Sequence, residues 1–293
     1  MEEQRRLEGC RPASQGVIRD PMQGPVENAL MLVAAGNAQL AGKDIAGFWP
    51  DAPTFKFLKL CEFRLPPASG NDKDAFPLVA ADPTEWFGFQ KANCRGYRLH
   101  HTQHQRGPNQ QIDAPDRMLA AFVGGGPRFL IEAVGQFNSE LWEGFHRLGD
   151  RNDPDRRIWL CTHILQGMIP VKEVEPVQLP VALENLHAAL AEIEAYARAE
   201  EYDTFADCFA RASAALAGER QDPWPHQGEI VRYTGFDQRQ LSVLHAVNHA
   251  WVFGGMGSWN DLGGGPQYDA VSEKLYSALN DSIAALGNST FRG

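Results

Sequence analysis

The sequence predicts an α+β fold, in which a mostly antiparallel β-sheet domain precedes a four-helix domain. Between residues 55 and 165, apolar residues occur in short runs typical of half-buried strands. Loops rich in Gly, Pro, Asn and Asp separate these runs, which favours antiparallel neighbours over strand–helix–strand units. After residue 180, apolar residues recur every three or four positions, as they do in amphipathic helices.

The first half of the chain is expected to begin with a helix and to continue with strands. The helix is predicted at Pro25–Gly42, which has an apolar face and ends in glycine. The predicted strands are Phe55–Phe63, "EWFGFQ", "GYRLHHTQ", "RMLAAFV", "RFLIEAV", "ELWEGFHRL" and "RRIWLCTHIL". Within Arg117–Val134, a "GGGP" turn joins two of these strands in the clearest predicted hairpin.

The second half is expected to be helical. Pro170–Pro180 contains three prolines and is predicted to be an extended connector. The four predicted helices contain the apolar stripes Leu183–Ala197, Phe205–Leu216, Leu241–Trp251 and Tyr268–Leu286. Helices of this length are marginal alone, so we expect them to pack as a bundle. The predicted division is a disordered lead-in at 1–24, a sheet domain with an N-terminal helix at 25–175, and an acidic helical domain at 176–293.

The net charge of the 293-residue chain, −10, lies mostly in its second half. Residues 1–175 carry 20 Lys and Arg against 22 Asp and Glu, which gives −2, and residues 176–293 carry 7 against 15, which gives −8. Because an acidic surface repels phosphate backbones, nucleic acid is not expected as a partner. The same charge would attract another protein of basic character, so such a protein is the predicted partner.

Location and cysteine chemistry follow from the composition. Apolar runs stay well below the ~20 residues of a membrane helix, and the polar N-terminus lacks the apolar core of a secretory signal. We therefore expect no membrane partner and a cytoplasmic location. In that reducing compartment the five cysteines, which show no CxxC spacing, should be free thiols packed as small apolar side chains. Cys161 and His163 would share a strand face, which alone does not make a thiol reactive.

The least ordinary stretch of the chain is "WVFGGMGSWNDLGGG", the glycine loop at Trp251–Gly265. One interpretation is structural, because a glycine pair can end the helix before the loop and Pro266 can begin the next one. Asn260 and Asp261 would then bond backbone amides, as they do in turns. A nucleotide cradle is not indicated, since neither a GxGxxG nor a GxxxxGK[ST] pattern is present.

The alternative interpretation makes the glycine loop a contact site for a protein partner, because aromatic side chains anchor interfaces. The candidate binding residues are Met256, Trp259, Asn260, Asp261 and, in the loop "DPWPHQG", Trp224.

A family resemblance enters at this loop. The ten residues Phe253–Leu262, "FGGMGSWNDL", resemble the G-G-M-G-S-x-N-D core of a family of uncharacterised bacterial proteins. The resemblance covers residues 176–293 and is sharpest over those ten residues. It implies a helical fold for this half and a bacterial origin. It implies no established activity and no catalytic residues.

A metal site is the alternative use of the same half. His245 and His249 are one helical turn apart, so both imidazoles could bind one divalent metal ion, with Asp261 as a third ligand. The sequence between the histidines lacks the glutamate of the HExxH pattern. No cofactor is predicted, and a divalent metal remains the alternative.

Our preferred hypothesis is a bacterial cytosolic protein-interaction module without catalysis, acting as an immunity-type or regulatory partner. The acidic second half and the aromatic loops motivate it. The first alternative is a metal-dependent hydrolase that uses His245, His249 and Asp261. The second is a small-ligand binder with a pocket between the two domains. A serine hydrolase is not supported, since the chain has no GxSxG elbow.

Overall fold

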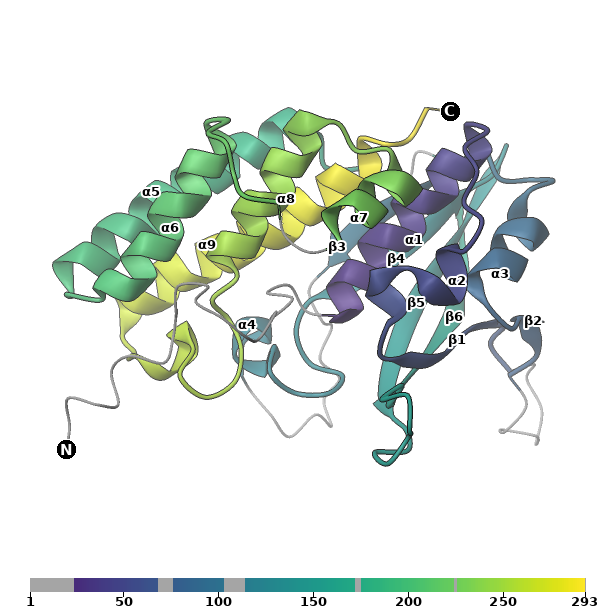
Figure 1. Cartoon of the computed structure of the whole chain (residues 1–293), viewed down its shortest axis with the longest axis horizontal. Helices are drawn as coiled ribbons and strands as arrows, with labels where there is room; N and C mark the ends of the chain where they lie inside the picture. Colours follow the sequence, from purple (N-terminus) through teal and green to yellow (C-terminus); the bar gives the residue numbers. More distant parts are fainter. Residues whose placement is uncertain (1–23, 68–75, 103–113, 172–174, 224–225, 293) are drawn as a thin grey trace.

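The computed structural model describes residues 24–67, 76–102, 114–171, 175–223 and 226–292, and within them the chain has an α+β fold. Helices cover one face of a twisted sheet, and most of the helices that follow residue 178 lie together beyond one edge of that sheet (Figure 1). The predicted lead-in at 1–24 falls almost entirely outside the described residues. In the described part of the chain, no helix is both long and apolar enough to cross a bilayer.

The α-helices are α1 (Gly24–Leu40), α2 (Phe48–Asp51), α3 (Pro83–Gln90), α4 (Asp116–Leu119), α5 (Leu179–Ala199), α6 (Asp203–Leu216), α7 (Gln227–Thr234), α8 (Gln238–Ala250) and α9 (Pro266–Asn288). Short 3-10 helices are η2 (Pro53–Phe55) and η3 (Trp259–Asp261). The strands are β1 (Leu58–Arg64), β2 (Leu78–Ala80), β3 (Gly96–Thr102), β4 (Arg128–Val134), β5 (Asn138–Leu148) and β6 (Trp159–Pro170).

The described strands form one sheet in the order β2-β1-β6-β5-β4-β3. Strands β1 and β6 are parallel, and the other neighbours are antiparallel. The sheet is therefore mixed, and four of its five strand pairs are antiparallel, which agrees with the mostly antiparallel prediction, whereas the parallel pair β1–β6 was not predicted. Alternation of apolar and polar residues reports that one face is buried, but it carries no information about the direction of the neighbouring strand.

One predicted strand is a helix. The segment "EWFGFQ" belongs to α3, where the Asp82 carboxylate accepts a hydrogen bond of 2.9 Å from the Glu85 amide and Pro83 occupies the first helical turn. This cap favours a helix start, and it turns Trp86 and Phe87 together into the core. Tertiary packing and the cap thus outweigh the strand-like composition of the segment.

The predicted hairpin at Arg117–Val134 is also wrong, because its first half forms α4 and a turn. The Arg117 side chain is buried and forms ion pairs with carboxylates of α9. A strand at this position would break these ion pairs. Gly124 and Gly126 have φ angles of 76° and 91° and carry the chain through the turn. Only the second half is a strand, β4, which pairs with β3 and β5.

The four predicted helical stripes lie in α5, α6, α8 and α9, and the expected opening helix is α1. Helix α7 is an addition, since its eight residues are too short to show a clear apolar stripe. The apolar core continues from α1 and the sheet into the later helices without a break. The structure therefore does not confirm a separate four-helix domain.

Two asparagines attach the helices to the edge strand β3. Asn37 of α1 donates to the Tyr97 carbonyl at 2.8 Å and accepts from the Tyr97 amide at 2.7 Å. Asn288 of α9 binds Leu99 in the same way, accepting at 2.7 Å and donating at 3.0 Å. Each carboxamide thus takes the place of a neighbouring strand, which protects the sheet edge and fixes the helices against it.

Candidate functional site

The glycine loop is anchored by Trp259, which points inward and is fully buried. The Trp259 indole nitrogen donates a hydrogen bond of 2.7 Å to the Ser272 hydroxyl of α9, and its backbone amide donates to the Val252 carbonyl at 3.1 Å. The rings around it are Tyr196, Tyr202, Phe205, Phe209 and Tyr268. Trp259 therefore joins α5, α6 and α9, and its ring is not available to a partner.

The other predicted loop residues divide between structure and surface. The Asp261 carboxylate accepts a hydrogen bond of 2.6 Å from the Gly257 amide, as the turn interpretation expects. Asn260 faces α4, where its amide donates to the Arg117 carbonyl at 2.9 Å. The Met256 side chain, in contrast, is fully exposed. Trp224 lies outside the described residues.

Arg117 fixes α4 against the glycine loop and α9. Its guanidinium lies 2.6 Å from the Asp269 carboxylate and 3.5 Å from that of Glu273, and it stacks 5.6 Å from the Tyr268 ring centroid. The side chain is only 3% exposed, so this guanidinium is desolvated and held by several partners at once. These contacts hold the α4 segment and the glycine loop in fixed positions next to α9.

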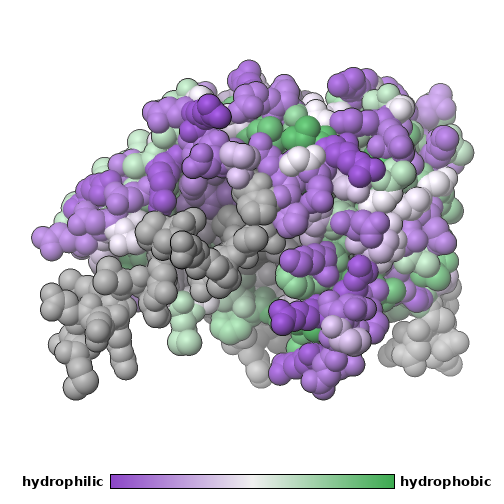
Figure 2. All heavy atoms as spheres, viewed as in Figure 1, coloured by the Kyte–Doolittle hydropathy of each residue, from purple (hydrophilic) through white to green (hydrophobic). Residues whose placement is uncertain are grey.

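The α4 segment and the glycine loop carry exposed apolar side chains, which we name together the loop patch. Its members are Met118, Phe122, Val123 and Met256. Phe122 is 67% exposed and Val123 57% exposed. On the face that Figure 2 shows, hydrophilic residues predominate, with apolar residues between them. Exposed apolar groups on segments that are fixed in place are typical of interaction sites.

The predicted metal ligands of the helical half do not converge. The rings of His245 and His249 stack with centroids 6.4 Å apart, and their Nε2 atoms lie 3.1 Å and 3.2 Å from the side-chain oxygens of Gln227 and Gln221. Burial and the neighbouring His249 lower the pKa of His245 to about 4. These histidines are held as neutral, hydrogen-bonded groups, and Asp261 bonds its own loop instead.

Within the described part of the chain, three potential ligand groups come close enough to share a metal ion at one place, formed by Cys61, Cys161 and His163. Cys61 and Cys161 are direct partners on the parallel strands β1 and β6, and Cys161 also lies opposite His146 on β5. The Cys161 sulfur lies 3.7 Å from His163 Nδ1 and 3.9 Å from His146 Nδ1. We name these four residues the Cys–His cluster.

The thiols of the Cys–His cluster are fully buried, and they are free, as is that of Cys94. Burial raises the pKa of the Cys161 thiol well above its ordinary value. Cys208 is disulfide-bonded, which corrects the expectation of free thiols at that position. The sequence pointed to Cys161 and His163 as neighbours on one strand, but it gave no sign that Cys61 and His146 join them.

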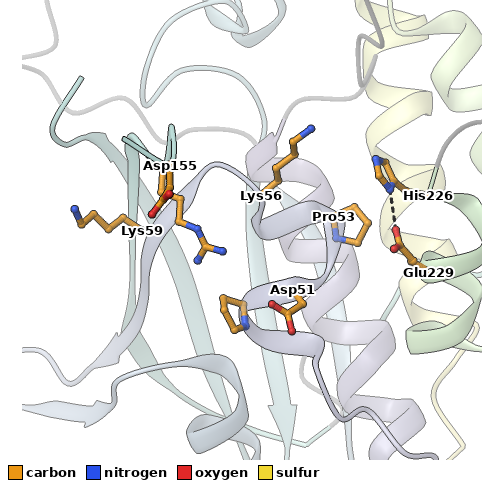
Figure 3. Close-up of a pocket in the computed structure, with 9 residues that line it drawn as sticks. Asp51, Pro53, Lys56, Lys59, Asp155, His226 and Glu229 are labelled. Atoms are coloured by element: carbon orange, nitrogen blue, oxygen red, sulfur yellow. Dashed lines mark hydrogen bonds and ion pairs between the residues drawn. The ribbon is translucent and has the colours of Figure 1, made fainter. Parts of the chain in front are cut away.

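An open polar pocket lies where the sheet half meets α7 (Figure 3). It has a volume of about 710 Å³ and is lined by Pro50, Asp51, Pro53, Lys56, Lys59, Asp155, Arg157, His226 and Glu229. The buried Asp153 carboxylate shapes one wall, because it accepts hydrogen bonds from the amides of Asp155 and Arg157 at 3.1 Å and binds Lys59 at 2.6 Å.

Charges of both signs face this pocket. His226 is paired with Glu229 at 2.8 Å, as Figure 3 shows. Among the described residues, Lys56 and Arg157 have no carboxylate within ion-pair distance. Two cationic groups thus remain available to a ligand, beside the carboxylate of Asp51. The sequence analysis considered a pocket between the two halves but named none of these lining residues, because the walls come from three segments that are distant in the chain.

Comparison of the chain with protein-family models, curated proteins and solved structures gives no match. The resemblance of Phe253–Leu262 to an uncharacterised bacterial family therefore stays a prediction.

Proposed function

We propose that this protein binds another protein through the loop patch and that the partner is basic. The observation that carries the proposal is the exposure of Met118, Phe122, Val123 and Met256. These residues lie on two segments, α4 and the glycine loop, that the buried Arg117 holds in place. Met side chains adapt to varied surfaces, and aromatic groups anchor interfaces, so this combination suits a protein contact.

Charge supports a basic partner. Among the described residues, the buried Arg117 pairs with Asp269 and Glu273 of α9, and Asp116 of α4 and Asp261 of the glycine loop add two further carboxylates. The helical half as a whole carries −8. Opposite charge at the rim of an interface steers association and selects partners, whereas the apolar centre supplies affinity. The proposal includes a cytoplasmic location and an immunity-type or regulatory role without catalysis.

Affinity purification from the native cells tests this proposal. The tagged wild type should bring down one basic protein in stoichiometric amount, and higher salt should slow its association. The double variant Phe122→Asp/Met256→Asp should lose that protein. The control is Phe89→Asp, which changes another exposed phenylalanine, on α3. Three outcomes would overturn the proposal. The two variants could capture the protein equally well, or the captured protein could be acidic. The wild type could also sediment as a dimer that is lost in the double variant but kept in the control.

A second candidate function is small-ligand binding, and the polar pocket of Figure 3 favours it. Because unpaired cationic side chains and a carboxylate line this pocket, a small zwitterion such as a free amino acid suits it best. A thermal-shift screen of amino acids tests the idea, since a ligand that binds the folded state raises the melting temperature. The double variant Lys56→Ala/Arg157→Ala should lose that rise, and the control Lys274→Ala on α9 should keep it.

A further inference from the structure

The Cys–His cluster gathers soft metal ligands from three neighbouring strands of the sheet. Cys61 lies on β1, Cys161 and His163 on β6, and His146 on β5, and all four side chains project from the face that the helices cover. The strand register brings them together, because Cys161 lies directly opposite both Cys61 and His146.

The separations are close to those of a tetrahedral zinc site. With Zn–S near 2.3 Å and Zn–N near 2.0–2.1 Å, the sulfur and nitrogen ligands of such a site lie about 3.6 Å apart. In this structure His163 Nδ1 lies 3.7 Å from the Cys161 sulfur and 4.0 Å from the Cys61 sulfur. His146 Nδ1 lies 3.9 Å from the Cys161 sulfur. The ligand atoms of Cys61, Cys161 and His163 all lie within 4.8 Å of one another. His146 lies outside that group of three but within 3.9 Å of the Cys161 sulfur, so its side chain would have to rotate to become the fourth ligand.

The surroundings of His163 indicate that its present contacts are incomplete. Its side chain is 2% exposed, and both ring nitrogens face sulfur atoms, the Cys161 sulfur at 3.7 Å and 4.0 Å and the Cys61 sulfur at 4.0 Å. Sulfur is a weak hydrogen-bond partner, whereas buried imidazoles normally have strong ones. A metal ion bound to the imidazole and both sulfurs would satisfy all three groups.

Charge balance favours the same occupant. Two cysteine thiolates and two neutral imidazoles around one divalent cation make a site with no net charge. Such a site suits the dry core, where an uncompensated charge is costly. Two sulfur and two imidazole ligands in tetrahedral reach are typical of Zn²⁺.

The groups behind the ligands hold them in place. The Asn28 amide lies 3.4 Å from His146 Nε2 and is itself bound by the Thr54 hydroxyl at 2.5 Å. The Phe63 ring stacks on His163 with centroids 4.5 Å apart. A Cβ at Gly144 would lie 2.9 Å from His163 Nε2, so only glycine leaves the imidazole its position. Supporting contacts of this kind orient the ligands of metal sites.

We propose that Cys61, Cys161, His163 and His146 bind one Zn²⁺ ion, which ties β1, β5 and β6 together inside the core. The ion would be structural, because four protein ligands complete its coordination and none is left open for a substrate.

Metal analysis of the full-length protein, purified under reducing conditions without added metal, tests this proposal. We expect about one zinc per chain. Cys161→Ser should lose it, and Cys94→Ser, which changes another buried thiol, should retain it. Chelation should lower the melting temperature of the wild type, and Zn²⁺ but not Mg²⁺ should restore it.

A second measurement keeps the test decisive if Cys161→Ser fails to fold. Co²⁺ added to the chelated wild type should give the intense visible absorption of a tetrahedral thiolate site, and His146→Asn should change that spectrum. Folded wild-type protein that contains no zinc and shows no such absorption with Co²⁺ would overturn the proposal. A Cys61–Cys161 disulfide in freshly purified protein would overturn it as well.

Discussion

The glycine loop and the Cys–His cluster concentrate unusual residues in opposite ways. The glycine loop is one continuous stretch, and its central residue, Trp259, packs inward to join three helices. The Cys–His cluster combines residues up to 102 positions apart, which only the strand register brings together. A conspicuous local sequence can thus serve mainly to connect helices, whereas residues that look ordinary along the chain can assemble the stronger chemical site.

The largest loss of stability should come from a substitution of Trp259, because this residue anchors the glycine loop. Trp259→Ala should lower the free energy of unfolding by about 3–5 kcal/mol, because a fully buried indole and its hydrogen bond to Ser272 are lost. Urea melts measure this change. Met256→Ala, which changes an exposed residue three positions earlier in the glycine loop, is the control and should stay within about 0.5 kcal/mol. Similar losses for both variants would mean that Trp259 is not the anchor.

The next effect tests how tightly the Cys–His cluster is packed. Gly144→Ala should lower the free energy of unfolding by about 1–3 kcal/mol, since its Cβ would lie 2.9 Å from the His163 ring and 3.5 Å from the Cys161 sulfur. Gly167→Ala on β6 is the matched control, because a Cβ there meets nothing within 4 Å. If both substitutions leave the urea midpoint unchanged, the cluster is looser than these distances require.

Much of the helical half could be predicted because its signals are local. The stripes of α5, α6, α8 and α9 repeat within one segment, and each helix had to bury its own stripe. The segment "EWFGFQ" shows the limit of such reasoning, since six residues fit a strand or a helix equally well. There the capping contact of Asp82 decided the outcome.

The candidate sites were predicted less well, because they depend on pairing between distant segments. Nothing near Cys61 in the chain reveals that β1 runs parallel to β6 and places this thiol beside Cys161. Likewise, Arg117 gives no local sign that it pairs with Asp269, 152 positions away. Of the interpretations offered for Asp261, the one as a turn former agrees with the structure, and it was accessible because the hydrogen bond from the Gly257 amide lies within four positions of the chain.

The histidine pair of α8 offers a test of pH dependence. Burial, together with His249, lowers the pKa of His245 to about 4, below the ~6.5 of an unfolded chain. Between these values the unfolded chain binds a proton that the folded chain does not. The contribution of His245 to the free energy of unfolding is therefore fully present above pH 6.5. It is lost as the pH drops toward 4, by at most about 1.4 kcal/mol per pH unit for each proton.

Urea melts at pH 7, 6 and 5 measure this slope, and His245→Gln should make it shallower by removing one of the groups that titrate on unfolding. A slope that His245→Gln leaves unchanged would show that His245 takes up its proton equally well in the folded chain. If the wild type contains zinc and His245→Gln loses it, the metal site would lie at α8 and not at the Cys–His cluster of the sheet.

The smallest effect separates two glycines of the same loop. Gly257 has a φ of 79°, in the left-handed region, whereas Gly255 does not, and a Cβ at either position meets nothing within 4 Å. Gly257→Ala should therefore cost about 1 kcal/mol through backbone strain alone, and Gly255→Ala should cost almost nothing. Urea melts of the two variants side by side give the difference. Because the Gly257 amide also donates to Asp261, a larger loss at Gly257 would show that the strain breaks this turn, and equal values would show that the loop adjusts its backbone freely.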